Sequence, residues 1–370
     1  MTTRLRIAHI VPRLAIGGMV TQLSQQLKFL GPDFRQQVFS IFSAADEISE
    51  KWIGSDIIRL GRNPDERSKI ELISKQIYHS LSMFKPDVIC SYHVFTDIYI
   101  KSFLESNDAI AIRHVLGFSQ VSMFDKFQDG TVIMDWSPEV LKIERSVDDH
   151  FAINIAVSYD IASQLRRSEF TKKPIKVIYP GVINDEKNRY PTQREGEMHV
   201  AFLNRLEPIK QPMEFLKIAR RIADSCAHAK FHVLEKGSLL DDFKSEAEVY
   251  RLTRTIEYVS VQSNVWRSVH SVNALLFTSA HEGVPLLAIE AMSRGIPVVG
   301  YRVGGLPELV SSGHNGFLVD PGDIDGMARA VLEVSRCRQF SVRSAEAAKK
   351  RFSLSDYLSQ LRELYSVRKT

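Results

Sequence analysis

Short apolar runs alternate with helical patterns along the whole chain. Residues 6–11, Arg-Ile-Ala-His-Ile-Val, predict a buried strand, and residues 19–30 predict a helix with Leu23, Leu27 and Leu30 on one face. The first half contains further expected strands at residues 87–91, 109–112, 152–158 and 176–179. This alternation favours an α/β fold in which parallel sheets are covered by helices on both faces.

The pattern breaks near the middle of the chain. Residues 184–196 are polar and rich in turn-forming residues, which indicates a linker. Beyond it the alternation restarts, with an expected helix at residues 213–223 and strands at residues 199–203, 230–234, 255–258, 274–277 and 297–300. A chain of 370 residues also exceeds the size of about 250–300 residues at which single cores stop growing. We therefore expect two doubly wound, Rossmann-like domains facing a central cleft that holds the ligand.

The last segment, residues 355–367, forms an amphipathic helical pattern of its own. One face of the expected helix carries Tyr357, Leu358, Leu361, Leu364 and Tyr365. Such a face has to be buried, and the pattern alone leaves open which domain receives it.

Composition and charge narrow the classes of function. Hydrophobic residues make up 44% of the chain and charged residues 25%, which excludes a disordered or fibrous protein. The net charge is only +4 and no basic stripe with interleaved aromatic residues occurs, so nucleic acid is not an expected partner. Three widely spaced cysteines (Cys90, Cys226 and Cys337) fit a reducing compartment. With no apolar run near the ~20 residues that cross a bilayer and no signal-peptide pattern, we expect a cytoplasmic protein.

The segment most informative about chemistry follows the expected strand that ends at Phe277. Glu282, Gly283, Val284 and Pro285 form a tight loop, and Pro285 suits the first turn of a helix that stops at Gly295. The start of that helix offers unpaired backbone N–H groups and the positive end of the helix dipole, which suit a diphosphate. Glu282 precedes the helix and Glu290 lies one to two turns into it. One carboxylate could accept sugar hydroxyls and the other ribose hydroxyls, while solvated carboxylates beside a helix start are the alternative interpretation.

These residues carry a resemblance to a known family. Glu282 and Glu290 form the E-x7-E signature, and its context, Glu-Gly-Val-Pro-Leu-Leu…Glu-Ala-Met…Gly-Ile-Pro-Val-Val, resembles retaining glycosyltransferases of family 4, which have the GT-B fold. The resemblance covers essentially the whole chain. It implies an acceptor-binding domain at residues 1–183, the linker at 184–196, a nucleotide-sugar-binding domain at 197–351, and a C-terminal helix at 352–370 that crosses back to pack on the first domain.

The resemblance also assigns roles to individual residues. Arg205 and Lys210 match the family's two cations that hold the donor diphosphate, where they would neutralise the leaving group. The alternative is that they are surface cations at a helix start, a place where the helix dipole disfavours positive charge. The implied catalytic residues are His114, Glu282, Arg205 and Lys210. The implied donor-binding residues are Gly17, Gly18, Arg205, Lys210, Glu282, Gly283, Val284, Pro285, Leu286, Leu287 and Glu290. Gly304 and Gly305 would offer backbone N–H groups to the donor, or simply form a turn.

His114 stands at the end of an expected strand, where the family has a histidine near the reacting carbon of the sugar. His93 is a competing candidate, and a structural hydrogen-bonding role is common for a histidine at a strand end. Gly17 and Gly18 resemble the family's glycine loop, although Val20 stands where the family often has glutamate.

No metal and no cofactor is expected. Asp323 and Asp325 match the D-x-D pattern of metal-dependent glycosyltransferases, but they precede a helical pattern, so helix capping explains them better. The chain has no other cluster of carboxylates or histidines at metal-ligand spacing.

By resemblance, the protein transfers a hexose-type sugar from a nucleoside-diphosphate-sugar to a saccharide or lipid-linked acceptor, with retention, in bacterial lipopolysaccharide, capsule or exopolysaccharide synthesis. A non-hydrolysing sugar-nucleotide epimerase and a non-catalytic GT-B partner subunit remain alternatives. The second is motivated by Val20 and Pro180, which stand where the family has glutamate and asparagine. The basic pairs at 166–167 and 172–173 could contact the inner membrane leaflet, and solvated surface charge is the other interpretation.

Overall fold

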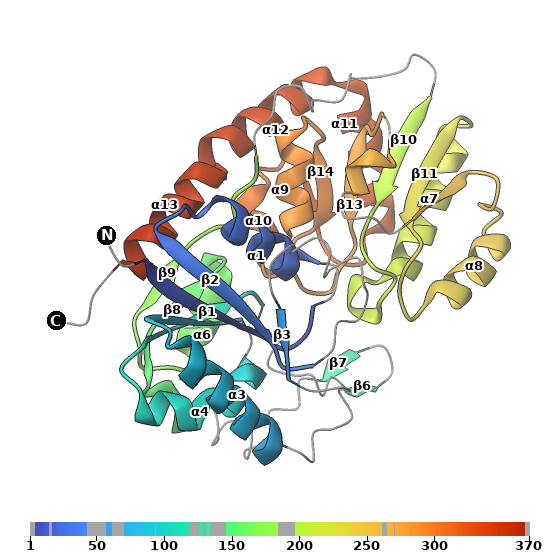
Figure 1. Cartoon of the computed structure of the whole chain (residues 1–370). Helices are drawn as coiled ribbons and strands as arrows, with labels where there is room; N and C mark the ends of the chain where they lie inside the picture. Colours follow the sequence, from blue (N-terminus) through green and yellow to red (C-terminus); the bar gives the residue numbers. More distant parts are fainter. Residues whose placement is uncertain are drawn as a thin grey trace. The chain divides into compact units, whose positions relative to one another are not determined.

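The computed structural model describes residues 4–14, 17–42, 57–60, 70–92, 94–117, 126–128, 131–133, 146–183, 197–260, 265–269 and 271–366. The chain divides into two units (Figure 1). Unit 1 comprises Met1–Pro180 and Ser355–Thr370, and unit 2 comprises Gly181–Leu354. The expected linker at 184–196 lies outside the described residues.

Unit 1 is built on a seven-stranded sheet with the order β3-β2-β1-β4-β5-β8-β9. Neighbouring strands are parallel. The strands are β1 (Leu5–Val11), β2 (Phe34–Ser40), β3 (Ile57–Arg59), β4 (Val88–Ser91), β5 (Ile110–Val115), β8 (Phe151–Ala156) and β9 (Ile175–Val177). The helices are α1 (Gly18–Phe29), α3 (Ile70–Phe84), α4 (Val94–Ser106) and α6 (Tyr159–Arg167), and a short antiparallel pair, β6 (Lys126–Gln128) and β7 (Thr131–Ile133), accompanies them. Strand order reverses between β1 and β4, so the loop after β1, which leads to Gly17 and Gly18, lies where α/β sheets bind ligands.

Unit 2 is built on a six-stranded sheet with the order β12-β11-β10-β13-β14-β15. Here too neighbouring strands are parallel. The strands are β10 (Met198–Phe202), β11 (Ala229–Leu234), β12 (Ile256–Val259), β13 (Ala274–Phe277), β14 (Val298–Tyr301) and β15 (Gly316–Val319). The helices are α7 (Pro212–Ser225), α8 (Leu240–Val249), α9 (Leu286–Ser293), α10 (Leu306–Leu309), α11 (Ile324–Arg336) and α12 (Arg338–Arg351), with 3₁₀ turns η4 (Pro208–Lys210) and η5 (Val265–Arg267). Strand order reverses between β10 and β13.

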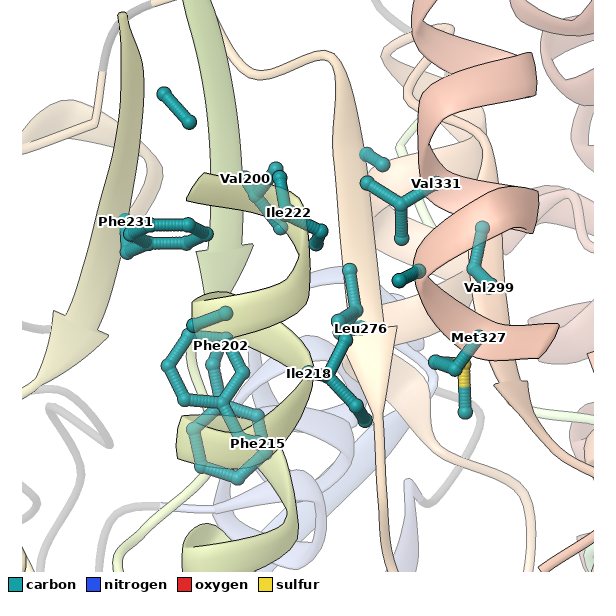
Figure 2. Packing of buried hydrophobic residues seen from close by; sticks show 14 of the residues in the cluster. Val200, Phe202, Phe215, Ile218, Ile222, Phe231, Leu276, Val299, Met327 and Val331 are labelled. Atoms are coloured by element: carbon teal, nitrogen blue, oxygen red, sulfur yellow. The ribbon is translucent and has the colours of Figure 1, made fainter. Parts of the chain in front are cut away.

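The core of unit 2 joins β10 and β11 to helix α7 through aromatic rings. Phe202 of β10 stacks on Phe215 of α7 with ring centroids 4.8 Å apart, and Phe215 meets the edge of Phe231 of β11 at 6.0 Å. Figure 2 shows these rings beside aliphatic side chains of α7, β13, β14 and α11, among them Ile218, Leu276, Val299 and Val331. Burial on both faces explains why these strands are almost continuously apolar in the sequence.

The strands expected from apolar runs are all present, with ends shifted by a few residues at most. Strands β2, β3, β6, β7 and β15 have no counterpart among the expected strands. Strand β2 reads Phe-Arg-Gln-Gln-Val-Phe-Ser, and its first half is only partly buried, so it lacks an apolar run. Asp323 caps α11 as expected, because its Oδ1 accepts a hydrogen bond of 2.8 Å from the N–H of Gly326.

The C-terminal helix α13 (Leu354–Tyr365) packs against α1 within unit 1, as the resemblance implied. Arg362 donates from Nε to the carbonyl of Leu30 at 2.7 Å and from Nη2 to that of Phe29 at 2.8 Å. These bonds satisfy carbonyl groups that the end of α1 leaves without partners inside the helix.

The side-chain amide of Gln26 connects α1, β4 and α13 in the interior of unit 1. Its Oε1 accepts from the hydroxyls of Tyr92 at 3.1 Å and Tyr365 at 2.9 Å, and its Nε2 donates to the hydroxyl of Tyr357 at 2.9 Å. All four side chains are buried. Since buried polar groups need partners, this one amide fixes where α13 sits on α1.

Replacing Gln26 by Ala should therefore lower the free energy of unfolding by about 3 kcal/mol, because three buried tyrosine hydroxyls each lose one hydrogen-bond partner. Urea denaturation followed by circular dichroism measures the change. Lys28→Ala, an exposed change on the same helix, is the control and should shift stability by no more than about 0.5 kcal/mol. Equal effects of the two changes would show that the amide does not hold the helix.

Candidate active site

The candidate site lies in unit 2 at the carboxyl ends of β10 and β13. These strands are neighbours, and the order of strands reverses between them. In parallel α/β sheets ligands bind at such a reversal, outside the carboxyl ends of the strands. The loops that follow are residues 203–211 and 278–285, which contain most of the donor-binding residues expected in this half of the chain.

Backbone contacts tie the two loops together. Thr278 Oγ1 donates to the carbonyls of Lys210 at 2.8 Å and Gln211 at 3.1 Å, and the N–H of Ala280 donates to the carbonyl of Ile209 at 2.9 Å. Gln211 adopts a left-handed conformation, φ 47°, which turns the chain from η4 into α7. The backbone of Lys210 is therefore fixed beside the loop that carries Glu282.

Lys210 and Glu282 form an ion pair within this site. Lys210 Nζ lies 2.6 Å from Glu282 Oε1, and Ser279 Oγ donates to the same oxygen at 2.6 Å. The Glu282 side chain is only 7% exposed, while Lys210 is partly exposed. A carboxylate this buried needs such partners, because an unpaired buried charge costs several kcal/mol. Two of the residues that the sequence analysis selected thus meet, although 72 positions separate them.

Arg205 and Asn204 stand at the start of the first loop. Arg205 is exposed, and no acidic side chain among the described residues pairs with its guanidinium group. The amide nitrogen of Asn204 is buried and has no hydrogen-bond partner in the described part of the chain. Leu206 anchors the loop, since its N–H donates to the carbonyl of Lys236 at 2.7 Å. A cation and an unused N–H donor beside a strand end suit an anionic ligand.

The start of helix α9 adds backbone donors. Pro285 is the capping residue, no side chain caps the helix there, and the first turn contains no acidic residue. Val284 and Leu286 are buried and Leu287 is partly buried, so these residues contribute backbone groups more than side chains. An uncapped helix start favours an anion through its N–H groups and the helix dipole.

Gly304 and Gly305 pack their backbone directly against the Glu282 loop. The N–H of Gly305 donates to the carbonyl of Glu282 at 2.9 Å. A Cβ on Gly304 would lie 1.8 Å from that carbonyl oxygen, and a Cβ on Gly305 would lie 1.8 Å from the carbonyl oxygen of Gly283. The expectation that the Gly305 N–H is offered to the donor is therefore wrong, because that N–H is used within the protein. The glycines are required for close contact between two loops.

Glu290 lies in α9 and is held by two residues that the sequence analysis did not select. Trp266 Nε1 donates to Glu290 Oε2 at 2.8 Å, and Arg294 Nη1 donates to the backbone carbonyl of Glu290 at 2.8 Å. Burial raises the pKa of Glu290, and the hydrogen bond from Trp266 and the charge of Arg294 oppose that rise. No sequence pattern links Trp266 to Glu290, since 24 residues separate them.

His114 occupies the interior of unit 1. Its ring stacks on Tyr92 with centroids 4.5 Å apart, and its Nε2 lies 3.2 Å from the hydroxyl of Tyr365. Burial lowers the pKa of His114 to about 3, so its imidazole is neutral at physiological pH. This environment is that of a structural hydrogen-bonding histidine, and a catalytic role for His114 stays a prediction. His93 lies outside the described residues.

Gly17 and Gly18 are exposed at the start of α1, at the carboxyl end of β1. Their donor contact stays a prediction too. Among the described residues, no group of histidine, cysteine, aspartate and glutamate is arranged to hold a metal ion. Within the same part of the chain, no helix has the length and apolar character needed to traverse a bilayer.

Two α/β units, each built on a parallel sheet, are the architecture of the GT-B class of fold. Solved structures agree. Sucrose-phosphate synthase from Thermosynechococcus elongatus has a TM-score of 0.80 at 18% identity and covers 98% of each chain. Anabaena Alr3699/HepE in complex with UDP and glucose has a TM-score of 0.80 at 16% identity, over 98% of this chain and all of the other.

Residues 183–351 match the family described as glycosyl transferases group 1. N-acetyl-alpha-D-glucosaminyl L-malate synthase of Bacillus anthracis is 23% identical over 223 residues, which is 57% of this chain and 58% of the relative. Lipopolysaccharide 1,6-galactosyltransferase of Escherichia coli (strain K12) is 27% identical over 183 residues, 47% of this chain and 49% of the relative. The chain thus spans about half the length of the curated relatives it matches.

The contact of Gly304 with the Glu282 loop can be tested by adding a methyl group. Gly304→Ala should destabilise the protein by about 2 kcal/mol more than Gly313→Ala. Both glycines have positive φ, 52° and 78°, so both changes strain the backbone, but a Cβ at Gly313 meets no atom within 4 Å. Chemical denaturation of the two variants measures the difference. Equal destabilisation would mean that the Gly304 loop can move away from the Glu282 loop without lowering the free energy of unfolding.

Proposed function

We propose that the protein is a retaining glycosyltransferase that moves a hexose-type sugar from a nucleoside-diphosphate-sugar to a saccharide or lipid-linked acceptor. The observation that carries the proposal is the ion pair of Lys210 with Glu282 at the strand reversal of unit 2, in the two loops that also contain Arg205 and lead to the uncapped start of α9. These groups fall within the residues that match the glycosyl transferase family. They offer an anion two cations and a row of backbone N–H donors.

The donor diphosphate binds between Arg205, Lys210 and the N–H groups at the start of α9. Negative charge grows on the diphosphate as the glycosidic bond breaks, and cations already in place stabilise that charge without reorganisation. Glu282 accepts hydroxyls of the sugar, and its contact with Lys210 orients the carboxylate. Glu290 accepts hydroxyls of the ribose.

Retention requires the acceptor to attack from the face that the diphosphate leaves. We propose that the leaving phosphate itself takes the acceptor's proton, so no protein nucleophile is needed. The contribution of the protein is then to position the reactants and stabilise charge.

The relatives support a substrate class. One is named lipopolysaccharide 1,6-galactosyltransferase and another UDP-Gal:alpha-D-GlcNAc-diphosphoundecaprenol alpha-1,3-galactosyltransferase, both of Escherichia coli. A role in bacterial surface polysaccharide assembly at the cytoplasmic face of the membrane follows as part of the proposal. The Arg166–Arg167 pair needs no lipid to explain it, since these cations end α6, where the helix dipole favours positive charge.

The first test combines a donor screen with Arg205→Ala. Thermal-shift measurements with UDP-, GDP- and ADP-sugars identify the donor, and Arg205→Ala should then lower kcat by about 10²–10³-fold because charge on the leaving group loses a partner. The melting temperature should not change, since Arg205 is exposed.

Arg254→Ala is the matched control, because Arg254 is also an exposed arginine of unit 2 but precedes the amino end of the edge strand β12, whereas the candidate site lies at the carboxyl ends of β10 and β13. A near-normal rate for Arg205→Ala would remove its diphosphate role. Conversion of a UDP-sugar to its epimer in the absence of acceptor would instead indicate an epimerase.

Transfer should be independent of metal ions, because the proposed site neutralises the diphosphate with side-chain cations and backbone donors. Dialysis against EDTA should leave the rate of transfer within about twofold of the untreated enzyme, and added Mg²⁺ or Mn²⁺ should not raise it. Loss of activity with EDTA that Mg²⁺ restores would contradict this part of the proposal.

A further inference from the structure

We propose that Trp266 is a positioning residue for the donor nucleotide, acting through Glu290. Its indole N–H holds one carboxylate oxygen so that the other is presented to the ribose hydroxyls. The inference rests on the proposed function, since it concerns how the same donor site recognises the ribose.

The contact is specific in its geometry. Trp266 lies in η5, between β12 and β13, and is 5% exposed. Its Nε1 donates to Glu290 Oε2 at 2.8 Å. Indole N–H is a donor only, and a carboxylate has two oxygens with about four acceptor positions. Trp266 therefore uses one position on Oε2 and leaves Oε1 to accept hydroxyl groups.

Arg294 contacts both Trp266 and the backbone of Glu290. Its guanidinium carbon lies 5.0 Å from the centroid of the Trp266 ring, and its Nη1 donates to the backbone carbonyl of Glu290 at 2.8 Å. Arg294 thus contacts both the indole and the helix turn that carries the carboxylate. A cation over an indole face is attracted to it, so the indole is fixed against α9.

The arrangement also serves the ionisation that ribose binding needs. The ionised carboxylate leaves the lone pairs of Oε1 open to both vicinal hydroxyls, whereas a protonated carboxyl offers fewer acceptor positions, and burial raises the pKa of Glu290. The Trp266 hydrogen bond and the positive charge of Arg294 counter that rise. Arg294 is the charged group that acts on Glu290 within the described residues.

A purely structural role for Trp266 would be that of a large apolar side chain that fills space. Trp266→Phe separates the two roles, because phenylalanine keeps an aromatic ring and most of the apolar area but has no N–H. The full-length protein is titrated by calorimetry with UDP and with 2′,3′-dideoxy-UDP. If the donor screen selects another base, GDP or ADP and the corresponding dideoxy nucleotide are used in place of the two uridine nucleotides.

We expect Trp266→Phe to weaken UDP binding about tenfold and to change dideoxy-UDP binding by less than about twofold. Arg267→Ala, an exposed neighbour in the same 3₁₀ turn, should leave both affinities unchanged. Equal weakening of both nucleotides, or no weakening of UDP, would overturn the inference.

The pH profile gives a second readout that space-filling would not alter. Glu290 accepts ribose hydroxyls only when ionised, so UDP affinity should fall as the pH drops through its pKa. Removing the Trp266 N–H removes an interaction that lowers that pKa. The loss of affinity should then begin at a higher pH in Trp266→Phe than in the wild type, and an unchanged profile would count against the inference.

Glu290→Ala separates this inference from the proposed function. If the wild type binds none of the three nucleotides, the proposed function fails and this inference with it. A second outcome is that the wild type prefers UDP to dideoxy-UDP, that Glu290→Ala abolishes this preference and that Trp266→Phe retains it. In that case the ribose site stands and only the role of Trp266 fails.

Discussion

The contact between Lys210 and Glu282 is the interaction on which the candidate site depends. It joins the loops that follow the central strands of unit 2, and Thr278 links the same two loops through the carbonyl of Lys210. Ser279 donates to Glu282 within its own loop. A buried carboxylate is tolerated only with such partners, so the ion pair requires both loops to be in place. The reversal of strand order brings these loops together, and the glycine pair at 304–305 lets a third loop approach without steric conflict.

The two glutamates of the signature sit in different environments. Glu282 meets a full positive charge and a hydroxyl, whereas Glu290 meets an indole N–H, with an arginine nearby. Glu282 is buried and Glu290 partly buried, and each carboxylate has hydrogen-bond donors that compensate for the water it loses. The spacing of the signature therefore places one acceptor on the loop and one on the helix that follows it. Residues distant in the sequence supply the hydrogen-bond donors and charges around each carboxylate.

Unit 1 shows how polar groups can specify packing. Gln26 links three tyrosines, and the hydroxyl of Tyr365 also lies beside His114, so the C-terminal helix is attached to α1, β4 and β5 through one buried network. A fully satisfied network of this kind selects one arrangement of the elements that contribute to it. It also explains why His114 is buried and neutral in a position where the family resemblance implied a residue near the reacting sugar.

The sequence by itself determined the α/β class, the expected strands, the capping role of Asp323 and the residues selected in the two loops at the strand reversal of unit 2. These follow from local rules: apolar runs mark strands buried on both faces, and glycine, proline and aspartate mark turns and helix starts. Strand β2 was not expected from those rules, because its first half is polar and only partly buried. The tertiary structure alone decided that Lys210 meets Glu282, that Trp266 and Arg294 hold Glu290, and that the Gly305 N–H is used internally. Such contacts join residues far apart in the chain, and no local pattern records them because their energy arises only when the sheet brings its strand ends together.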